Sequence, residues 1–167
     1  MPGILPPTGA REWGQRVEIA AGRRAPDCEE GSGVASIDAI AGIGHRDATK
    51  LRKARVRTTE ALLKKATTRA GRRRLAKATR VTEKVILEWV NRADLMRVKG
   101  VGEEYSDLLE KAGVDTVKEL RNRNPESLLA KMIEANESSR LVRRLPTLKM
   151  AEGWVRHAKR LPSVVKY

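Results

Sequence analysis

A short segment of this chain occurs twice, and this repeat constrains the fold more than any other feature. Residues 40–62 align without a gap with residues 98–120, and eight of the 23 aligned positions are identical. Both copies contain the same Gly-aliphatic-Gly step, which is Gly42, Ile43 and Gly44 in the first copy and Gly100, Val101 and Gly102 in the second. Because the glycines and the apolar spacing match, we predict that both copies form the same local structure.

Cap residues and apolar spacing predict helices throughout the repeated region, so the expected fold class is all-α. In the first half we expect helices over 46–54, from Thr58 or Thr59 to Ala66, from Thr67 or Thr68 to about Ala78, and over 83–91 after Thr82. In the second half the start signals are the capping-box pair Thr116 and Glu119, the pair Asn124 and Pro125, and Thr147, whose helix ends before Pro162.

The last helix of each half also matches, which defines the length of the repeat. Residues 82, 89, 90 and 93 recur at 147, 154, 155 and 158, an offset of 65 where the earlier offset is 58. The second copy therefore holds seven extra residues, near 136–144. We predict two small helical bundles in tandem, 37–93 and 94–161, followed by a C-terminal tail, 162–167. Trp89 and Trp154 are expected in the two cores.

Residues 1–36 differ from the rest in holding four of the seven prolines and no helical apolar stripe. We expect a disordered tail. A second hypothesis is that residues 1–33 are untranslated leader, since Glu29, Glu30 and Gly31 are encoded by purine-rich codons that can form a ribosome-binding site before a start at Val34. An N-terminal peptide from before Val34 in the native protein would contradict this hypothesis.

Composition excludes several classes of protein. With one cysteine and two histidines, Cys28, His45 and His157, we expect no disulfide framework, no metal site and no cofactor. No membrane span or signal peptide is apparent, so we expect a soluble cytoplasmic protein. No phosphate-binding loop or activated nucleophile gathers as a catalytic set, and we expect no enzyme. The net charge of +14 indicates a polyanionic partner.

The first glycine step resembles a known motif. With Ile40 before it, and Ala48 and Leu51 after it, the segment resembles the helix-hairpin-helix motif, and the continuation from Val56 to Leu62 is similar to SAM-like domains such as the RNA polymerase alpha C-terminal domain. The tandem arrangement resembles an uncharacterised bacterial family described only as a domain of unknown function. The resemblance implies a helix-hairpin-helix unit in each half and binding to DNA or to proteins.

The charges around the two copies differ, and they decide where we place the site. Residues 37–93 carry a net charge of +11 and residues 94–167 only +4. At four aligned pairs a basic residue becomes acidic: His45/Glu103, Arg46/Glu104, Arg52/Glu110 and Arg57/Asp115. Free N–H groups at a helix start suit a phosphate, and carboxylates beside them oppose it. The first copy is therefore the expected site.

The candidate nucleic-acid-binding residues are the first hairpin and two basic stripes: Gly42, Ile43, Gly44, His45, Arg46, Lys50, Lys53, Arg69, Arg72, Arg73 and Lys77. A weaker second site comprises Lys99, Gly100, Val101 and Gly102. The alternatives are a tight turn without a ligand and stripes that are only solvated helix faces. We expect sequence-independent binding of duplex or junction DNA. The other functions considered are a protein-interaction adaptor that docks a partner through the second copy, and binding of structured RNA.

Overall fold

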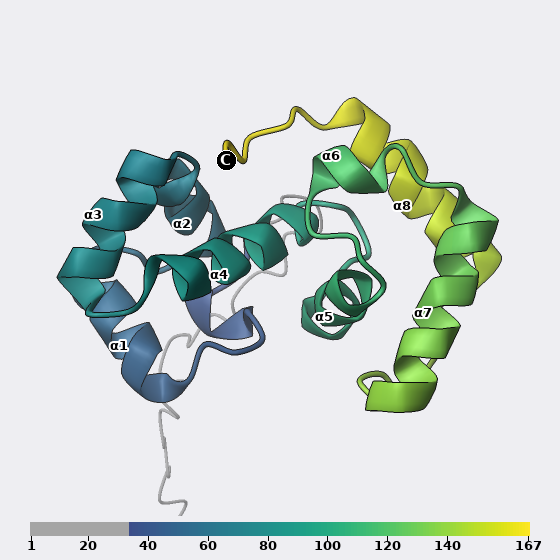
Figure 1. Ribbon diagram of the computed structural model, residues 1–167, viewed down its shortest axis with the longest axis horizontal. Coiled ribbons are helices and arrows are strands. Elements are labelled where there is room, and N and C mark those ends of the chain that lie inside the picture. Colours follow the sequence, from purple (N-terminus) through teal and green to yellow (C-terminus); the bar gives the residue numbers. More distant parts are fainter. Residues whose placement is uncertain (1–33) are drawn as a thin grey trace, which may run out of the picture. The chain divides into compact units, whose positions relative to one another are not determined.

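The structure, a computed structural model, describes residues 34–167 and consists of helices joined by short turns (Figure 1). It contains eight α-helices and one 3-10 helix. An isolated β-bridge pairs Ser36 with Thr58, and residues 34–167 contain no β-strand. The predicted all-α class is confirmed for this part of the chain.

The helices of the first half are η1 (Ile37–Ala39), α1 (His45–Lys53), α2 (Thr59–Ala66), α3 (Arg69–Thr79) and α4 (Glu83–Leu95). Helices α2, α3 and α4 begin directly after Thr58, Thr68 and Thr82, as the cap signals predict, whereas α1 begins one residue earlier than expected. The hydroxyl of Thr58 accepts a hydrogen bond from the N–H of Ala61, and Thr68 does the same for Gly71. These bonds satisfy amides that a helix start leaves without a partner.

The second half follows the same order. Its helices are α5 (Glu103–Lys111), α6 (Val117–Leu120), α7 (Pro125–Ser139) and α8 (Leu148–Arg160). Asn124 and Thr147 cap α7 and α8 as predicted. The capping box differs in one detail, because the carboxylate of Glu119 accepts from the N–H of Asp115 rather than of Thr116. Burial, and then the charge of Glu119, raise the pKa of Asp115.

Two hydrophobic clusters lie within one compact unit that includes residues 34–167. The first forms around Trp89, Ile86 and Leu51, and the second around Trp154, Leu108 and Leu109. Both tryptophans are only 2% exposed, so their prediction as core residues is confirmed. In the first cluster α4 packs against α2 and α3, and in the second α7 packs against α8 and α5.

Helix α4 joins the two clusters and is longer than predicted. We expected it to end near Asn91, but it continues to Leu95, which belongs to the second cluster. The sequence suggested an earlier end because Asn91, Arg92 and Asp94 interrupt the apolar pattern. Arg92 and Asp94 instead form ion pairs and hydrogen bonds at the junction of the two halves.

The seven extra residues of the second half lie at the end of α7 and in the loop after it. Relative to α3 at the offset of 58, α7 ends two residues later, and the connection to the next helix comprises residues 140–147 instead of 80–82. The hydroxyl of Tyr105 donates a hydrogen bond to the carbonyl of Arg144 at 3.1 Å. This bond attaches the longer loop to α5.

Both segments expected as tails take part in the fold where the structure describes them. Residues 1–33 lie outside the described part of the chain. Ala35 donates its N–H to the hydroxyl of Thr59, and the carbonyl of Ala35 accepts from the N–H of Thr59. At the other end, Val165 is 8% exposed in the first cluster, so residues after α8 return to the first half (Figure 1).

At one pair of aligned positions the backbone is left-handed in both halves, but only the second half has glycine there. Arg55 follows α1 with φ +59°, and Gly113 follows α5 with φ +80°; the two positions are aligned in the repeat. The left-handed conformation is unfavourable for a residue with a Cβ and costs glycine nothing. Arg55 is therefore the strained member of the pair.

We expect Arg55→Gly to stabilise the protein and Gly113→Arg to destabilise it, each by about 1 kcal/mol, because of this backbone difference. Urea unfolding measures both changes, provided that the dependence on urea keeps its slope. Arg55→Ala is the control, since it removes the charge and keeps the Cβ. If alanine stabilises as much as glycine, charge rather than backbone conformation limits stability at this position.

Candidate nucleic-acid interface

The first Gly-aliphatic-Gly step is a tight turn between η1 and α1. Ile43 donates its N–H to the carbonyl of Ile40 at 3.1 Å, and Gly42 between them has φ +86°. The side chain of Ile43 is 9% exposed and anchors the turn in the first cluster. Gly44 is the N-cap of α1, and its carbonyl accepts from the N–H groups of Asp47 and Ala48.

This turn leaves amides exposed at the start of α1. The N–H groups of Gly44, His45 and Arg46 have no acceptor among residues 34–167, and all three residues are exposed. These free N–H groups lie at the positive end of the helix dipole of α1, and both features favour binding of an anion there. The predicted donors Gly44, His45 and Arg46 are thus brought together.

The second step has the same backbone geometry. Val101 donates to the carbonyl of Val98 at 3.0 Å, Gly100 has φ +88°, and Gly102 is the N-cap of α5. Its exposed amides belong to residues that include Glu103 and Glu104, so two carboxylates lie at the start of the helix. The difference between the two hairpins is therefore one of charge.

Each hairpin lies over the buried tryptophan of its own cluster. A Cβ at Gly42 would approach the indole nitrogen of Trp89 to 3.8 Å and Arg92 Nη1 to 2.8 Å, and a Cβ at Gly100 would approach the indole nitrogen of Trp154 to 3.2 Å. Positive φ and this close approach together require glycine at both positions. The tryptophans support the turns from below and are not platforms for bases.

The cations of α1 differ in what they contact. Lys50 forms an ion pair with Asp47 at 2.7 Å, and both side chains are substantially exposed. Such a pair contributes little to stability, so Lys50 can exchange Asp47 for another anion. Arg46 and Lys53 are exposed and form no ion pair within residues 34–167. The neighbouring Arg52 pairs with Asp38.

The cations predicted on α3 divide into two groups. Arg69 and Arg73 both reach Glu83, at 3.5 and 3.3 Å, and remain mostly exposed. Lys77 is exposed, with no ion pair in the described region. Since α1 and α3 pack against each other, the two basic stripes are carried by neighbouring helices.

The prediction for Arg72 is wrong. Its side chain is buried, with 3% exposed, and Nη1 donates to the carbonyls of Thr67 at 3.0 Å and Lys166 at 2.8 Å. The N–H of Lys166 donates in turn to the carbonyl of Thr67. Arg72 therefore fixes the C-terminal segment to the first half instead of facing solvent. Its neighbours Arg69, Arg73 and Lys77 are exposed as a solvated stripe requires, whereas no signal in the sequence indicates the returning segment that covers Arg72.

Sequence reasoning missed Arg92, which contacts the first hairpin directly. Its guanidinium donates to the carbonyl of Ala41 and forms ion pairs with Asp107 and Glu110 of α5. A signal was present, because position 92 aligns with His157 at the offset of 65. The acidic change at position 110 is thus an internal ion pair rather than an open acidic surface.

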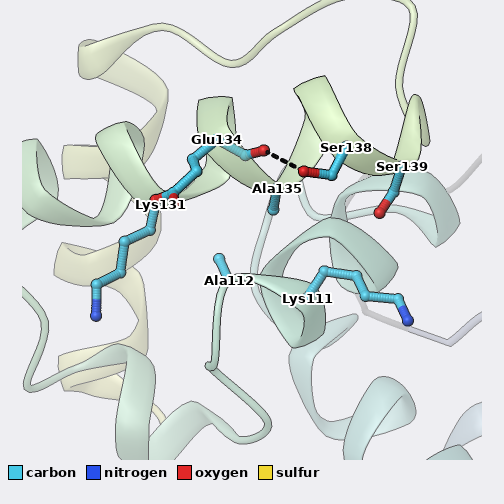
Figure 2. A pocket seen from close by; sticks show the side chains of 7 residues that line it. All are labelled: Lys111, Ala112, Lys131, Glu134, Ala135, Ser138 and Ser139. Carbon is cyan, nitrogen blue, oxygen red and sulfur yellow. Dashed lines mark hydrogen bonds between the residues drawn. The ribbon is translucent and has the colours of Figure 1, made fainter.

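Each half contains a pocket that includes the residue directly after its first α-helix, Ala54 or Ala112. The pocket of the second half lies between Lys111 and Ala112 at the end of α5 and one face of α7 (Figure 2). Its ammonium groups, on Lys111 and Lys131, point away from each other in Figure 2, and Glu134 lies on the same helix as Lys131. Apart from Ala54, the pocket of the first half is lined by other positions of the repeat, which include Lys64, Lys65 and Arg74.

No group of three or more His, Cys, Asp or Glu side chains within residues 34–167 is arranged to hold a metal ion. In the same part of the chain, no helix has both the length and the apolar character needed to cross a bilayer.

These features define an all-α protein in which two matched glycine turns each open a helix above a buried tryptophan. The family described as "Domain of unknown function (DUF4332)" matches residues 32–161, and the chain belongs to this family. The resemblance to a family of unknown function is therefore confirmed. Comparison with curated proteins and with solved structures finds no match.

We expect Arg72→Met to release the C-terminal segment. The lost hydrogen bond joins a charged donor to the carbonyl of Lys166, and such a bond contributes about 1.5–3 kcal/mol. The amide of Lys166 should then exchange its hydrogen about tenfold faster or more in native-state hydrogen exchange. Arg74→Met, at an exposed position of the same helix, is the control and should leave this rate unchanged. An unchanged rate in Arg72→Met would contradict the assigned role.

Proposed function

We propose that this protein is a non-enzymatic DNA-binding protein that grips the phosphate backbone without reading sequence, through a helix-hairpin-helix unit at residues 40–51. The observation that carries the proposal is the start of α1, where three exposed amides without an acceptor in the described region lie beside the unpaired cation Arg46. Backbone amides recognise phosphate and not bases, so such a site carries no sequence information by itself.

The surroundings of this hairpin support the same proposal. The half of the chain that contains it, residues 37–93, has a net charge of +11. Lys50 and Lys53 follow Arg46 along α1, and Lys77, Arg69 and Arg73 extend the positive surface on α3. Long-range attraction by such a surface raises the rate of association with a polyanion and weakens with salt.

We propose that the second hairpin is also part of a helix-hairpin-helix unit but does not bind phosphate. Its backbone is equivalent, but Glu103 and Glu104 lie at the start of α5. An adaptor that docks a basic partner would need free carboxylates on the second half. Asp107 and Glu110 are not free, because both pair with Arg92 of the same chain. This arrangement favours DNA binding by the first half over the docking of a basic protein by the second.

We expect the full-length chain to bind a labelled DNA duplex in fluorescence anisotropy, with an affinity that falls steeply between about 50 and about 200 mM salt. Arg46→Glu/Lys50→Glu should weaken binding by about a hundredfold or more, as expected for the loss of two charged hydrogen bonds of about 1.5–3 kcal/mol each. It should also reduce the log–log salt slope by about 2, because each neutralised phosphate contributes about 0.9.

The matched control is Arg156→Glu/Lys159→Glu on α8, which changes the net charge equally at exposed positions of the second half. It should affect binding much less. Equal losses in both double variants would mean that net charge, not the hairpin, drives binding. No binding at low salt would overturn the proposal, and tighter binding of an RNA duplex in competition would assign the surface to RNA.

A further inference from the structure

The first hairpin is attached to the second half of the protein through one side chain, that of Arg92 on α4. Nη1 donates to the carbonyl of Ala41, directly before Gly42. Nη2 contacts Asp107 Oδ1 at 3.0 Å, and Nε donates to Glu110 Oε2 at 2.5 Å. All three nitrogens of the guanidinium are therefore used, and they connect the hairpin with α5.

This contact is withdrawn from solvent. The side chains of Arg92, Asp107 and Glu110 are 14%, 18% and 22% exposed. Charges that water reaches poorly interact more strongly than exposed pairs such as Lys50 and Asp47. The planar guanidinium fork suits three acceptors in fixed directions, which a lysine ammonium on the same helix could not match.

In the second half, the residue aligned with Arg92 also contacts the backbone directly before the first glycine of the turn. His157 aligns with Arg92, and its Nδ1 accepts a hydrogen bond from the N–H of Lys99 at 2.9 Å. Lys99 aligns with Ala41 and directly precedes Gly100. In both halves this helix position thus holds the backbone before the first glycine, but only Arg92 also contacts the other half.

The carboxylates of α5 fall into two pairs. Asp107 and Glu110 contact Arg92, and they align with Thr49 and Arg52 of the first copy. Glu103 and Glu104 are exposed and form no ion pair within residues 34–167. One helix therefore carries two carboxylates that hold Arg92 and two that do not.

We propose that Arg92 is a positioning residue for the first hairpin, and that through it α5 of the second half sets how tightly the hairpin binds phosphate. The inference rests on the proposed function of the hairpin. A turn already held in its binding conformation loses less conformational freedom when the ligand binds, so its affinity is higher. The phosphate contacts themselves remain with Arg46 and the amides of α1.

The test compares two double variants of the full-length protein, Asp107→Ala/Glu110→Ala and Glu103→Ala/Glu104→Ala. Both remove two carboxylates from α5 and raise the net charge equally, so general electrostatics predicts tighter DNA binding by both. The positioning role of Arg92 instead predicts that the two variants differ in how their DNA affinity changes. Loss of Asp107 and Glu110 should weaken binding about fivefold or more, in the range of typical coupling between sites, while loss of Glu103 and Glu104 should not weaken it.

A second measurement follows the hairpin without DNA. In hydrogen exchange of the unliganded protein, the amide of Ile43, which donates to the carbonyl of Ile40, should exchange faster in Asp107→Ala/Glu110→Ala and not in Glu103→Ala/Glu104→Ala. In NMR of the same two variants, the amide signals of residues 42–46 should shift in the first and not in the second. Thermal unfolding of each variant establishes that the comparison is made on folded protein. A change confined to the hairpin distinguishes positioning from general destabilisation, which would accelerate exchange in both clusters.

The two proposals fail in different ways. If the parent protein binds DNA and the Asp107/Glu110 variant binds as tightly as the Glu103/Glu104 variant, the positioning role is overturned and the proposed function stands. If the parent protein binds no DNA, the proposed function is overturned, and with it the link to phosphate affinity. Unchanged exchange of the Ile43 amide together with unchanged amide signals of residues 42–46 in both variants overturns the positioning of the hairpin in either case.

Discussion

Both halves of the protein depend on α4, because this one helix supplies buried residues to both hydrophobic clusters. Ile86, Trp89 and Val90 belong to the first cluster, and Leu95 belongs to the second. The buried carboxylate of Asp94, 1% exposed, accepts from the N–H of Val117 at the start of α6 and pairs with Arg97. A break in α4 would separate the clusters and leave that charge without its partners.

The same junction explains why two equivalent hairpins differ in their surroundings. Gly42 and Gly100 have nearly the same φ, and each lies over a buried tryptophan. The backbone is thus fixed by features that both copies share. What differs is the set of charges around them, and part of that difference, at position 110, serves the contact between the halves. When two repeats pack against each other, some side chains form the contact between them. The same side chains would be exposed to solvent in a single repeat.

The sequence predicted those features whose causes are local. Thr58, Thr68 and Asn124 cap helices where expected, because a capping side chain acts on amides two or three residues away. The tryptophans are buried as their matched positions indicated. Arg46 and Lys77 are exposed as the stripes required. The DNA-binding function and the helix-hairpin-helix assignment remain proposals, since the family that includes this chain carries no assigned function.

Predictions differed from the structure where distant segments meet. Arg72 has the spacing of a solvated stripe, yet the returning C-terminal segment covers it and supplies the carbonyl of Lys166 as its acceptor. The sequence predicts a helix that ends at about residue 91, yet α4 continues through Arg92, and α5 provides two carboxylates that pair with its largely buried guanidinium.

The sequence by itself thus determined most of the helices, the glycine turns and the burial of the two tryptophans, because these follow from backbone conformation, local capping and apolar spacing. Only the tertiary structure decided which charges remain available to a ligand. Whether a charged side chain is exposed or buried depends on the partners that other segments of the chain bring to it. Asp94 accepts from the N–H of Val117 at the start of α6, and Arg72 donates to the carbonyl of Lys166 near the C-terminus.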